Sequence, residues 1–132
     1  MGKVTLDANV VIGLFRPADA HHNAVRTELA AARERADDFI LPASVLSEAM
    51  VGGYRHGTEA EMRRRILGLF GPARSVDEDV ALTAAELRAG HHSLRLPDAL
   101  VIATGIIENA TVLTCDRRLG TVHKSVRVIS PN

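Results

Sequence analysis

The segment VTLDANVVIGLF, residues 4–15, joins two apolar runs through a single acidic residue, Asp7. Residues 4–6 are β-branched or aliphatic, and they predict a short buried strand that ends at Asp7. Residues 9–15 stay apolar and predict a short helix, which Pro17 stops. A buried strand that runs into a helix is the opening of a parallel α/β arrangement.

The rest of the chain repeats this alternation of strands and helices. Asp19, Thr58 and Asp77 are the expected N-caps, and Glu61 completes a capping-box pattern with Thr58. Further strands are expected at residues 39–41, 74–76, 111–114 and 127–129, and helices at 20–35, from 42 through Glu48, at 58–70, 77–89 and 97–108. This order predicts a mostly parallel sheet of four to five strands, covered by helices on both faces.

Length and composition favour one domain, residues 1–132, with an aliphatic core, because only 3% of the residues are aromatic. The net charge of zero argues against nucleic-acid binding driven by bulk charge. Fourteen of the sixteen cationic residues are arginine, which favours bidentate contacts with phosphate or carboxylate groups.

The sequence also suggests a cellular location. A single cysteine excludes an intrachain disulfide and suits a reducing compartment. The N-terminal residues lack a secretory pattern, and the longest apolar run, residues 99–107, is too short to span a bilayer. We therefore expect a soluble cytoplasmic protein with no membrane partner.

Four of the sixteen acidic residues lie in the most apolar stretches of the chain. They are Asp7, Glu48 in LPASVLSEAMV (residues 41–51), Asp98 in LRLPDALVIATGII (94–107) and Asp116 in TVLTCDRRLG (111–120). Moving an ionised carboxylate from water into an apolar setting is costly unless it is paired or bound to a metal. Few basic residues accompany the four acids. We therefore expect them to meet in one pocket, neutralised by a divalent cation.

Two of the four acids follow strands. Asp7 comes directly after the first strand, and Asp116 comes two residues after the strand that ends at Thr114. Ligand sites in open α/β sheets form beyond the carboxyl ends of the strands. If the two strands are neighbours, both carboxylates project into the same crevice.

The other two acids are expected on inward helix faces. Asp98 shares a helical face with Val101 and Ile102, at spacings of three and four. Glu48 follows Val45 by three residues and is expected on a core-directed stripe. Two acids from strand ends and two from helix faces can therefore converge.

Convergence of carboxylates indicates a chemistry. Two carboxylates ~5 Å apart repel by about 3 kcal/mol at an effective dielectric near 20, so a cation is favoured between them. Hard oxygen ligands suit Mg²⁺ or Mn²⁺ rather than zinc. Such ions activate water and stabilise charge on a phosphoryl group. The pattern therefore predicts hydrolysis of a phosphodiester.

Four segments, in order and spacing, resemble the PIN-domain ribonuclease family, specifically the VapC-type toxins of type II toxin–antitoxin pairs. The resemblance covers essentially the whole chain and rests on LDANVVIGLF (6–15), SVLSEA (44–49), LPDALVIATG (96–105) and VLTCDRRL (112–119). It implies a three-layer α/β/α sandwich and a Mg²⁺- or Mn²⁺-dependent endoribonuclease. Relatives of this kind are usually homodimers, are silenced by a cognate antitoxin that inserts a segment into the active-site groove, and cut particular RNAs.

The resemblance also implies roles for individual residues. Asp7, Glu48, Asp98 and Asp116 would be the acidic quartet that holds the metal, and Asn9 and Thr114 would orient carboxylates or water. The family often carries a further acid just beyond the fourth, where this chain has Arg117 and Arg118. That difference leaves one or two metal ions open, and it makes both arginines candidate phosphate contacts.

Two other functions remain open from the sequence. One is a catalytically silent RNA- or protein-binding module with the same fold. The other is a phosphohydrolase with Asp7 as nucleophile, which would normally need a second acid in place of Asn9 and a positioned lysine. Metal-dependent RNA cleavage by the purified protein separates the leading hypothesis from both.

Overall fold

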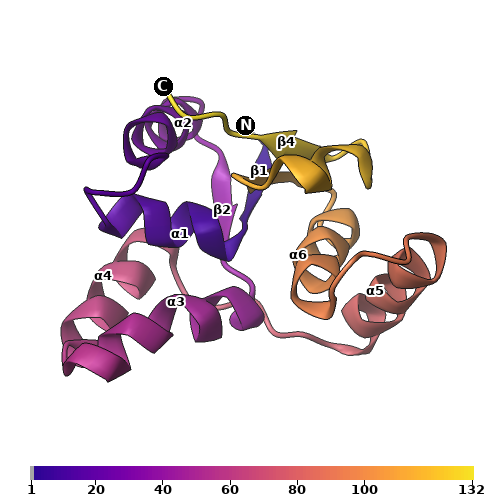
Figure 1. Ribbon diagram of the computed structural model, residues 1–132, viewed down its shortest axis with the longest axis horizontal. Helices are drawn as coiled ribbons and strands as arrows, with labels where there is room; N and C mark the ends of the chain where they lie inside the picture. The colour runs from indigo at the N-terminus through magenta and orange to yellow at the C-terminus, as the bar shows by residue number, and fades with distance from the viewer. Residues whose placement is uncertain (1) are drawn as a thin grey trace.

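The structure, a computed structural model, describes residues 2–132. Its centre is a parallel sheet of four strands in the order β2-β1-β3-β4 (Figure 1). The strands are β1 (Lys3–Leu6), β2 (Asp38–Ile40), β3 (Thr111–Thr114) and β4 (Val126–Val128). The central pair, β1 and β3, is buried apart from the first residue of each strand, as expected of strands covered on both faces.

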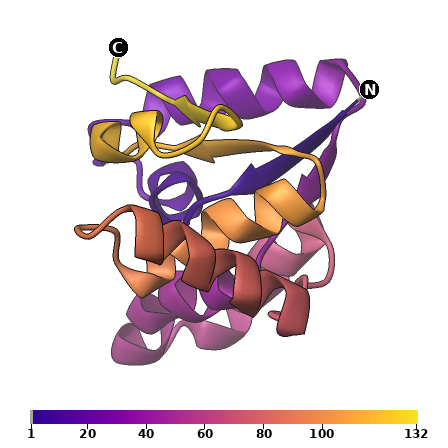
Figure 2. The same ribbon diagram turned by 90° about the vertical axis from the view of Figure 1, so that its right-hand side faces the viewer.

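Helices cover both faces of this sheet. In Figure 1, α1 and α2 lie to the left of the sheet and α6 and α5 to its right, with α3 and α4 below. Figure 2 shows α6 and α5 in front of the strands. The helices are α1 (Ala8–Phe15), α2 (His22–Glu34), α3 (Ala43–His56), α4 (Glu59–Phe70), α5 (Glu78–Gly90) and α6 (Leu96–Ile107), with a 3₁₀ turn η1 (Arg117–Thr121) after β3. This arrangement confirms the predicted fold class.

The predicted strand at residues 74–76 is wrong. Arg74 forms one isolated parallel bridge with Pro42, in which the Arg74 N–H donates to Leu41 O (2.7 Å) and the Ala43 N–H donates to Arg74 O (2.8 Å). The ladder stops there because the neighbouring chain turns into α3 at Ala43 and offers no further strand to pair with. The sheet in residues 2–132 therefore has four strands.

Of the three expected N-caps, one forms. The Asp77 carboxylate accepts an N–H from the first turn of α5 at 3.0 Å. Asp19 precedes α2 by a turn, and its carboxylate accepts the His21 N–H (2.8 Å) instead of capping the helix. Thr58 holds the N-cap position of α4 without a side-chain capping bond, so the capping box predicted with Glu61 does not form.

The core between sheet and helices is aliphatic, as the composition predicts. Leu6, Ile102 and Val112 are fully buried. Gly105 brings α6 directly onto β3, because a Cβ at this position would overlap the Val112 side chain. This close contact fixes α6, which carries Asp98, against the centre of the sheet. None of the helices in residues 2–132 is long and apolar enough to cross a membrane.

Candidate active site

The sheet topology places Asp7 and Asp116 at one edge of the sheet. β1 and β3 are parallel neighbours with Leu6 opposite Leu113, and the Asp7 N–H continues the ladder by donating to Leu113 O at 3.0 Å. Asp116 follows the end of β3 by two residues. The two strands are thus neighbours, which is the condition set by the sequence analysis, and both carboxylates lie beyond the strands' carboxyl ends.

Asp7 is a buried carboxylate, 5% exposed, held by uncharged donors. Its Oδ1 accepts the Ala8 N–H (2.7 Å) as the N-cap of α1. Its Oδ2 accepts the Thr114 hydroxyl (2.7 Å) and the Asn9 amide (3.2 Å). Burial raises the pKa of Asp7 to about 6 against the pull of the Thr114 and Ala8 hydrogen bonds, and the charges of Asp98 and Glu48 raise it further.

Asn9 and Thr114 link this carboxylate to the turn that carries Asp116. The Asn9 amide also donates to Thr114 Oγ1 (3.3 Å), and its Oδ1 accepts the Cys115 N–H (2.9 Å). Thr114 Oγ1 accepts the Asp116 N–H (3.0 Å). These contacts fix the orientation of Asp7 and the path of the chain into η1, which fits the supporting role that the resemblance implies for both residues.

Asp116 is held by an arginine rather than by neutral donors. Arg118 Nε donates to Asp116 Oδ1 (3.1 Å) and Nη2 to Oδ2 (2.7 Å), and the Arg118 backbone N–H donates to Oδ1 (2.9 Å). The hydrogen bonds from Arg118 lower the pKa of Asp116, against a smaller upward effect of burial. The expectation that few cations accompany the four acids is therefore wrong at this position.

Asp98 lies in the first turn of α6, with its side chain 17% exposed. Arg95 Nε stands 3.8 Å from its Oδ2, which is an ion pair without a close hydrogen bond. Burial raises the pKa of Asp98, and the charge of Asp116 adds to this, while Arg95 and Arg118 lower it. The charge of Asp98 thus acts on Asp7 and is acted on by Asp116, so the three aspartates form one electrostatic group.

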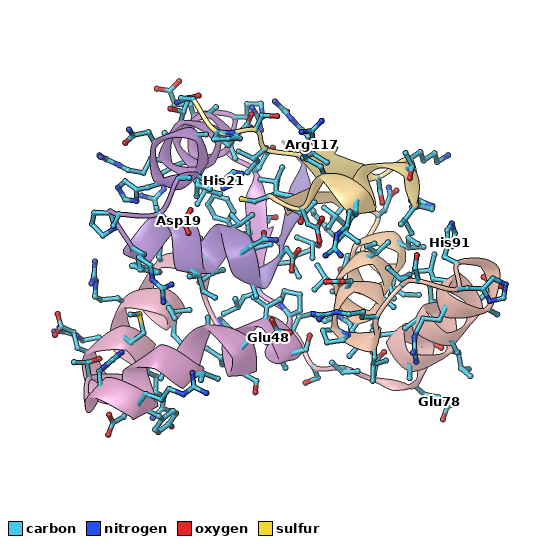
Figure 3. The ribbon with its side chains drawn as sticks, viewed as in Figure 1. Asp19, His21, Glu48, Glu78, His91 and Arg117 are labelled. Carbon is cyan, nitrogen blue, oxygen red and sulfur yellow. The ribbon has the colours of Figure 1, made fainter. Side chains whose placement is uncertain are left out.

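Glu48 departs from the prediction. It is exposed on α3 and makes no ion pair or side-chain hydrogen bond with residues 2–132, so the expected core-directed orientation is wrong. The buried face of α3 contains Val45 and Ala49, and Glu48 lies just outside this face. Figure 3 shows Glu48 on α3, below α1 and α6 in this view, and Arg117 above them on η1. The charge of Glu48 still reaches the site, since it raises the pKa of Asp7.

Two hollows adjoin these acids. One, of about 210 Å³, is lined by Arg95, Asp98 and Arg118. The other, of about 490 Å³, lies between α1, α3 and α4 and is lined by Glu48 and Arg16 among others. A third hollow, of about 630 Å³ between α2 and the end of α4, is lined by none of the four acids.

The donor set fits a hard cation in its chemistry. All four acids offer carboxylate oxygens, the ligands that Mg²⁺ and Mn²⁺ prefer. Within residues 2–132, however, no three His, Cys, Asp or Glu side chains stand close enough to hold one ion together. Mg²⁺ usually takes only one or two carboxylates and keeps several waters. The present arrangement therefore suits an ion held by one or two aspartates at a time.

Sequence reasoning did not predict the ion pairs of these acids: Arg95 was not singled out, and Arg118 was expected to contact phosphate rather than Asp116. Arg95 precedes Asp98 by three residues at a helix start, and Arg118 follows Asp116 by two at the start of η1. The spacing of three between Arg95 and Asp98 is one at which side chains meet on a helix, whereas the spacing of two between Asp116 and Arg118 brings them together only through the turn that begins η1. Arg117, in contrast, is exposed and makes no ion pair in the described part of the chain.

Comparison with known proteins agrees with the fold. Residues 4–124 match the model of the PIN domain family. The fold is similar to a solved toxin–antitoxin complex from Klebsiella pneumoniae (22% identity, TM-score 0.81, 98% of this chain and 99% of that one). It is also similar to VapBC2 from Rickettsia felis bound to a promoter DNA fragment (14% identity, TM-score 0.76, 98% of this chain and 99% of that one). A third similar structure is FitAcB from Neisseria gonorrhoeae (27% identity, TM-score 0.74, 97% of each chain). No curated protein sequence matches significantly. Since the family match spans most of its length, this chain belongs to the PIN domain family.

Proposed function

We propose that the protein is a Mg²⁺- or Mn²⁺-dependent endoribonuclease and the toxin of a toxin–antitoxin pair. The observation that carries the proposal is Asp7, a buried carboxylate whose pKa is raised to about 6. It lies with Asp116 beyond the carboxyl ends of the parallel strands β1 and β3, and the charge of Asp98 on α6 also raises its pKa. Keeping repelling acids together costs folding free energy and is typical of a site that binds a cation or moves protons.

Each residue has a distinct part in this proposal. One or two of Asp7, Asp98 and Asp116 would hold the ion directly, and the remaining acids, with Glu48 exposed at the rim, would contact it through the waters that the ion keeps. The ion would supply positive charge that activates water and stabilises the phosphoryl group. Thr114 and Asn9 keep the Asp7 carboxylate oriented through its Oδ2, so its remaining lone pairs face the same direction in every molecule.

The substrate and partners follow from the relatives and the charges. Solved structures of similar fold include toxin–antitoxin complexes, which supports a cognate antitoxin as protein partner. Arg117 is free to contact an RNA phosphate, and Arg95 and Arg118 line the hollow beside Asp98. We further propose a homodimer in the cytoplasm, organised as one domain, as is usual for such toxins.

The alternative with Asp7 as a covalent nucleophile is less compatible with the contacts. Both Asp7 oxygens already accept hydrogen bonds, and Oδ2 accepts two. That mechanism would also need a lysine positioned beside the nucleophile, and no lysine or arginine nitrogen lies within 4 Å of the Asp7 carboxylate among residues 2–132. The silent-module alternative predicts RNA binding without cleavage.

The decisive experiment compares RNA cleavage with Mg²⁺ or Mn²⁺, with EDTA, and by the Asp7→Ala variant. Asp79→Ala, which removes an exposed acid on α5, is the matched control. We expect metal-dependent cleavage by the wild type and the control and none by Asp7→Ala. Cleavage in EDTA, or undiminished cleavage by Asp7→Ala, would overturn the proposal.

A further inference from the structure

The carboxylate of Asp116 receives all its hydrogen bonds within residues 2–132 from one residue, Arg118. The guanidinium binds both oxygens in a fork, at 3.1 and 2.7 Å, and the backbone N–H adds a third bond to Oδ1 at 2.9 Å. A fork of this kind uses the two oxygens that a bound cation would need. Arg118 and a cation on Asp116 therefore compete for the same atoms.

The Arg118 side chain can leave without disturbing the core. It is 81% exposed, and Asp116 is its hydrogen-bonding partner in the described part of the chain. Arg74 offers a contrast, since its side chain is 22% exposed and is tied to Glu108 (3.0 Å), Asp77 (2.9 Å) and Ser75 O (2.7 Å). An exposed ion pair is weak, so a divalent ion can displace it at small cost.

A second arginine stands in a similar place. Arg95 approaches Asp98 from the N-terminal end of α6 at 3.8 Å and is 71% exposed. Both arginines line the hollow beside Asp98. The buried Asp7, by contrast, has no arginine or lysine nitrogen within 4 Å among residues 2–132. Among residues 2–132, the arginines that pair with the acids of the site thus lie on its open side, beside Asp98 and Asp116.

We propose that Arg118 is a displaceable counter-cation, which holds the Asp116 carboxylate in the metal-free protein and is released when a divalent ion binds there. This inference rests on the proposed function, because it assumes that Asp116 takes part in cation binding. Once released, the guanidinium remains at the hollow beside Asp98, where an RNA phosphate can take the place of the lost carboxylate. Arg118 is then a positioning residue that links metal loading to substrate binding.

The first test measures Mn²⁺ affinity by calorimetry in the wild type, Arg118→Ala, Arg118→Lys and Arg117→Ala. Arg117→Ala removes an adjacent exposed charge that makes no ion pair in residues 2–132, so it controls for charge alone. We expect Arg118→Ala to bind Mn²⁺ about two- to fivefold more tightly than Arg117→Ala, the range given by an exposed ion pair. Arg118→Lys keeps the charge but loses the fork, so it should also bind more tightly than the wild type.

The second test follows the Arg118 Nε–H signal by NMR during a Mg²⁺ titration. The signal should move to the position of a free guanidinium at saturation, while that of Arg74, which is bonded to Glu108 and Asp77, should stay. An unmoved Arg118 signal, or equal affinity of Arg118→Ala and Arg117→Ala with Arg118→Lys like the wild type, would overturn the inference alone. A wild type that binds no Mn²⁺ would overturn the proposed function and the inference with it.

Discussion

The carboxylate on the buried side of the site, Asp7, and the carboxylate on its open side, Asp116, are held by different interactions. Asp7 is enclosed, receives hydrogen bonds from neutral groups, and has a pKa raised to about 6. Asp116 is half-buried, both of its carboxylate oxygens accept hydrogen bonds from the Arg118 guanidinium, and its pKa is lowered. Desolvation is the largest effect on the pKa of Asp7, and the hydrogen bonds from the Arg118 side chain are the largest effect on the pKa of Asp116.

This difference suggests that Asp7 and Asp116 have different roles in the site. The Thr114 hydroxyl bridges the two sides, since it donates to Asp7 and accepts from the Asp116 N–H. A buried acid without a counter-charge attracts a cation, whereas a partly buried acid paired with an exposed arginine can exchange partners. We therefore expect changes at Asp7 to have larger effects than changes at Asp116.

The largest expected effect is on catalysis. Asp7→Asn should lower kcat/KM for RNA by more than about 100-fold, since even residues that only support metal ligands cost 10–100-fold. Asp116→Asn should lower it less, because Arg118 already competes for that carboxylate. Cleavage rates measured at saturating Mn²⁺ show which of the two variants loses more kcat/KM. A larger loss in Asp116→Asn would reverse the comparison.

The second effect is on stability and its pH dependence. Because the folded pKa of Asp7 is raised from 3.8 to about 6, the folded state binds more protons than the unfolded state between these values. Stability without metal should therefore fall as pH rises through this window, by up to about 3 kcal/mol. Asp7→Asn should lose this dependence and gain about 1–3 kcal/mol at pH 7, reduced by any hydrogen bond the amide cannot remake.

Urea unfolding in EDTA at pH 3, 4, 5, 6 and 8 measures this dependence. Asp116→Asn tests the opposite sign, because a pKa lowered from 3.8 contributes stability above pH 3.8 that is lost as the pH falls below this value. That contribution should be smaller, since the pair is exposed and screened by salt. The same pH slope in wild type and Asp7→Asn would contradict the assignment of the buried charge to Asp7.

The third effect is on the bridge between the two sides. Thr114→Val removes the donor to Asp7 and the acceptor for the Asp116 N–H, and should weaken Mn²⁺ binding about 10–100-fold. Thr5→Val is the matched control, because Thr5 is fully buried in β1 and its hydroxyl lacks a hydrogen-bond partner in residues 2–132. Calorimetry should find the control unchanged. Equal losses in both variants would indicate a general packing defect.

The smallest effect is on substrate affinity. Arg117→Ala should raise KM for RNA and lower the slope of log KM against log salt concentration by about 0.7, the value for one phosphate on a single strand. Arg64→Ala, an exposed arginine on α4, is the control and should leave the slope unchanged. If both variants change the slope equally, Arg117 has no special place in the substrate path.

Much of the fold follows from local sequence signals. Strands with consecutive β-branched or aliphatic residues, such as residues 111–114, were predictable because their burial on both faces demands that composition. The predicted strand at residues 74–76 failed because pairing depends on a neighbour, and the chain beside it enters α3. The cap at Asp19 failed because its carboxylate serves a turn before α2.

The candidate site was predictable to the extent that topology determines it. Asp7 and Asp116 follow adjacent parallel strands, and the sheet alone brings them together. The direction of Glu48 was not predictable, because helix phase is sensitive to where α3 begins and a small rotation moves a side chain from core to rim. The pairing of Arg118 with Asp116 was not predictable, because side chains two residues apart meet only where the backbone turns as it does at the start of η1.

The central claim is that the raised pKa of Asp7 marks a cation site. Thermal unfolding at pH 7.5 with increasing Mg²⁺ tests it most directly, in the wild type, Asp7→Asn and Asp79→Asn. Binding to the folded state alone raises stability with ion concentration. We predict a rising Tm for the wild type and Asp79→Asn, and a flat, initially higher Tm for Asp7→Asn. A Tm of Asp7→Asn that rises with Mg²⁺ as the wild type does, or a wild type that does not respond, would contradict the claim.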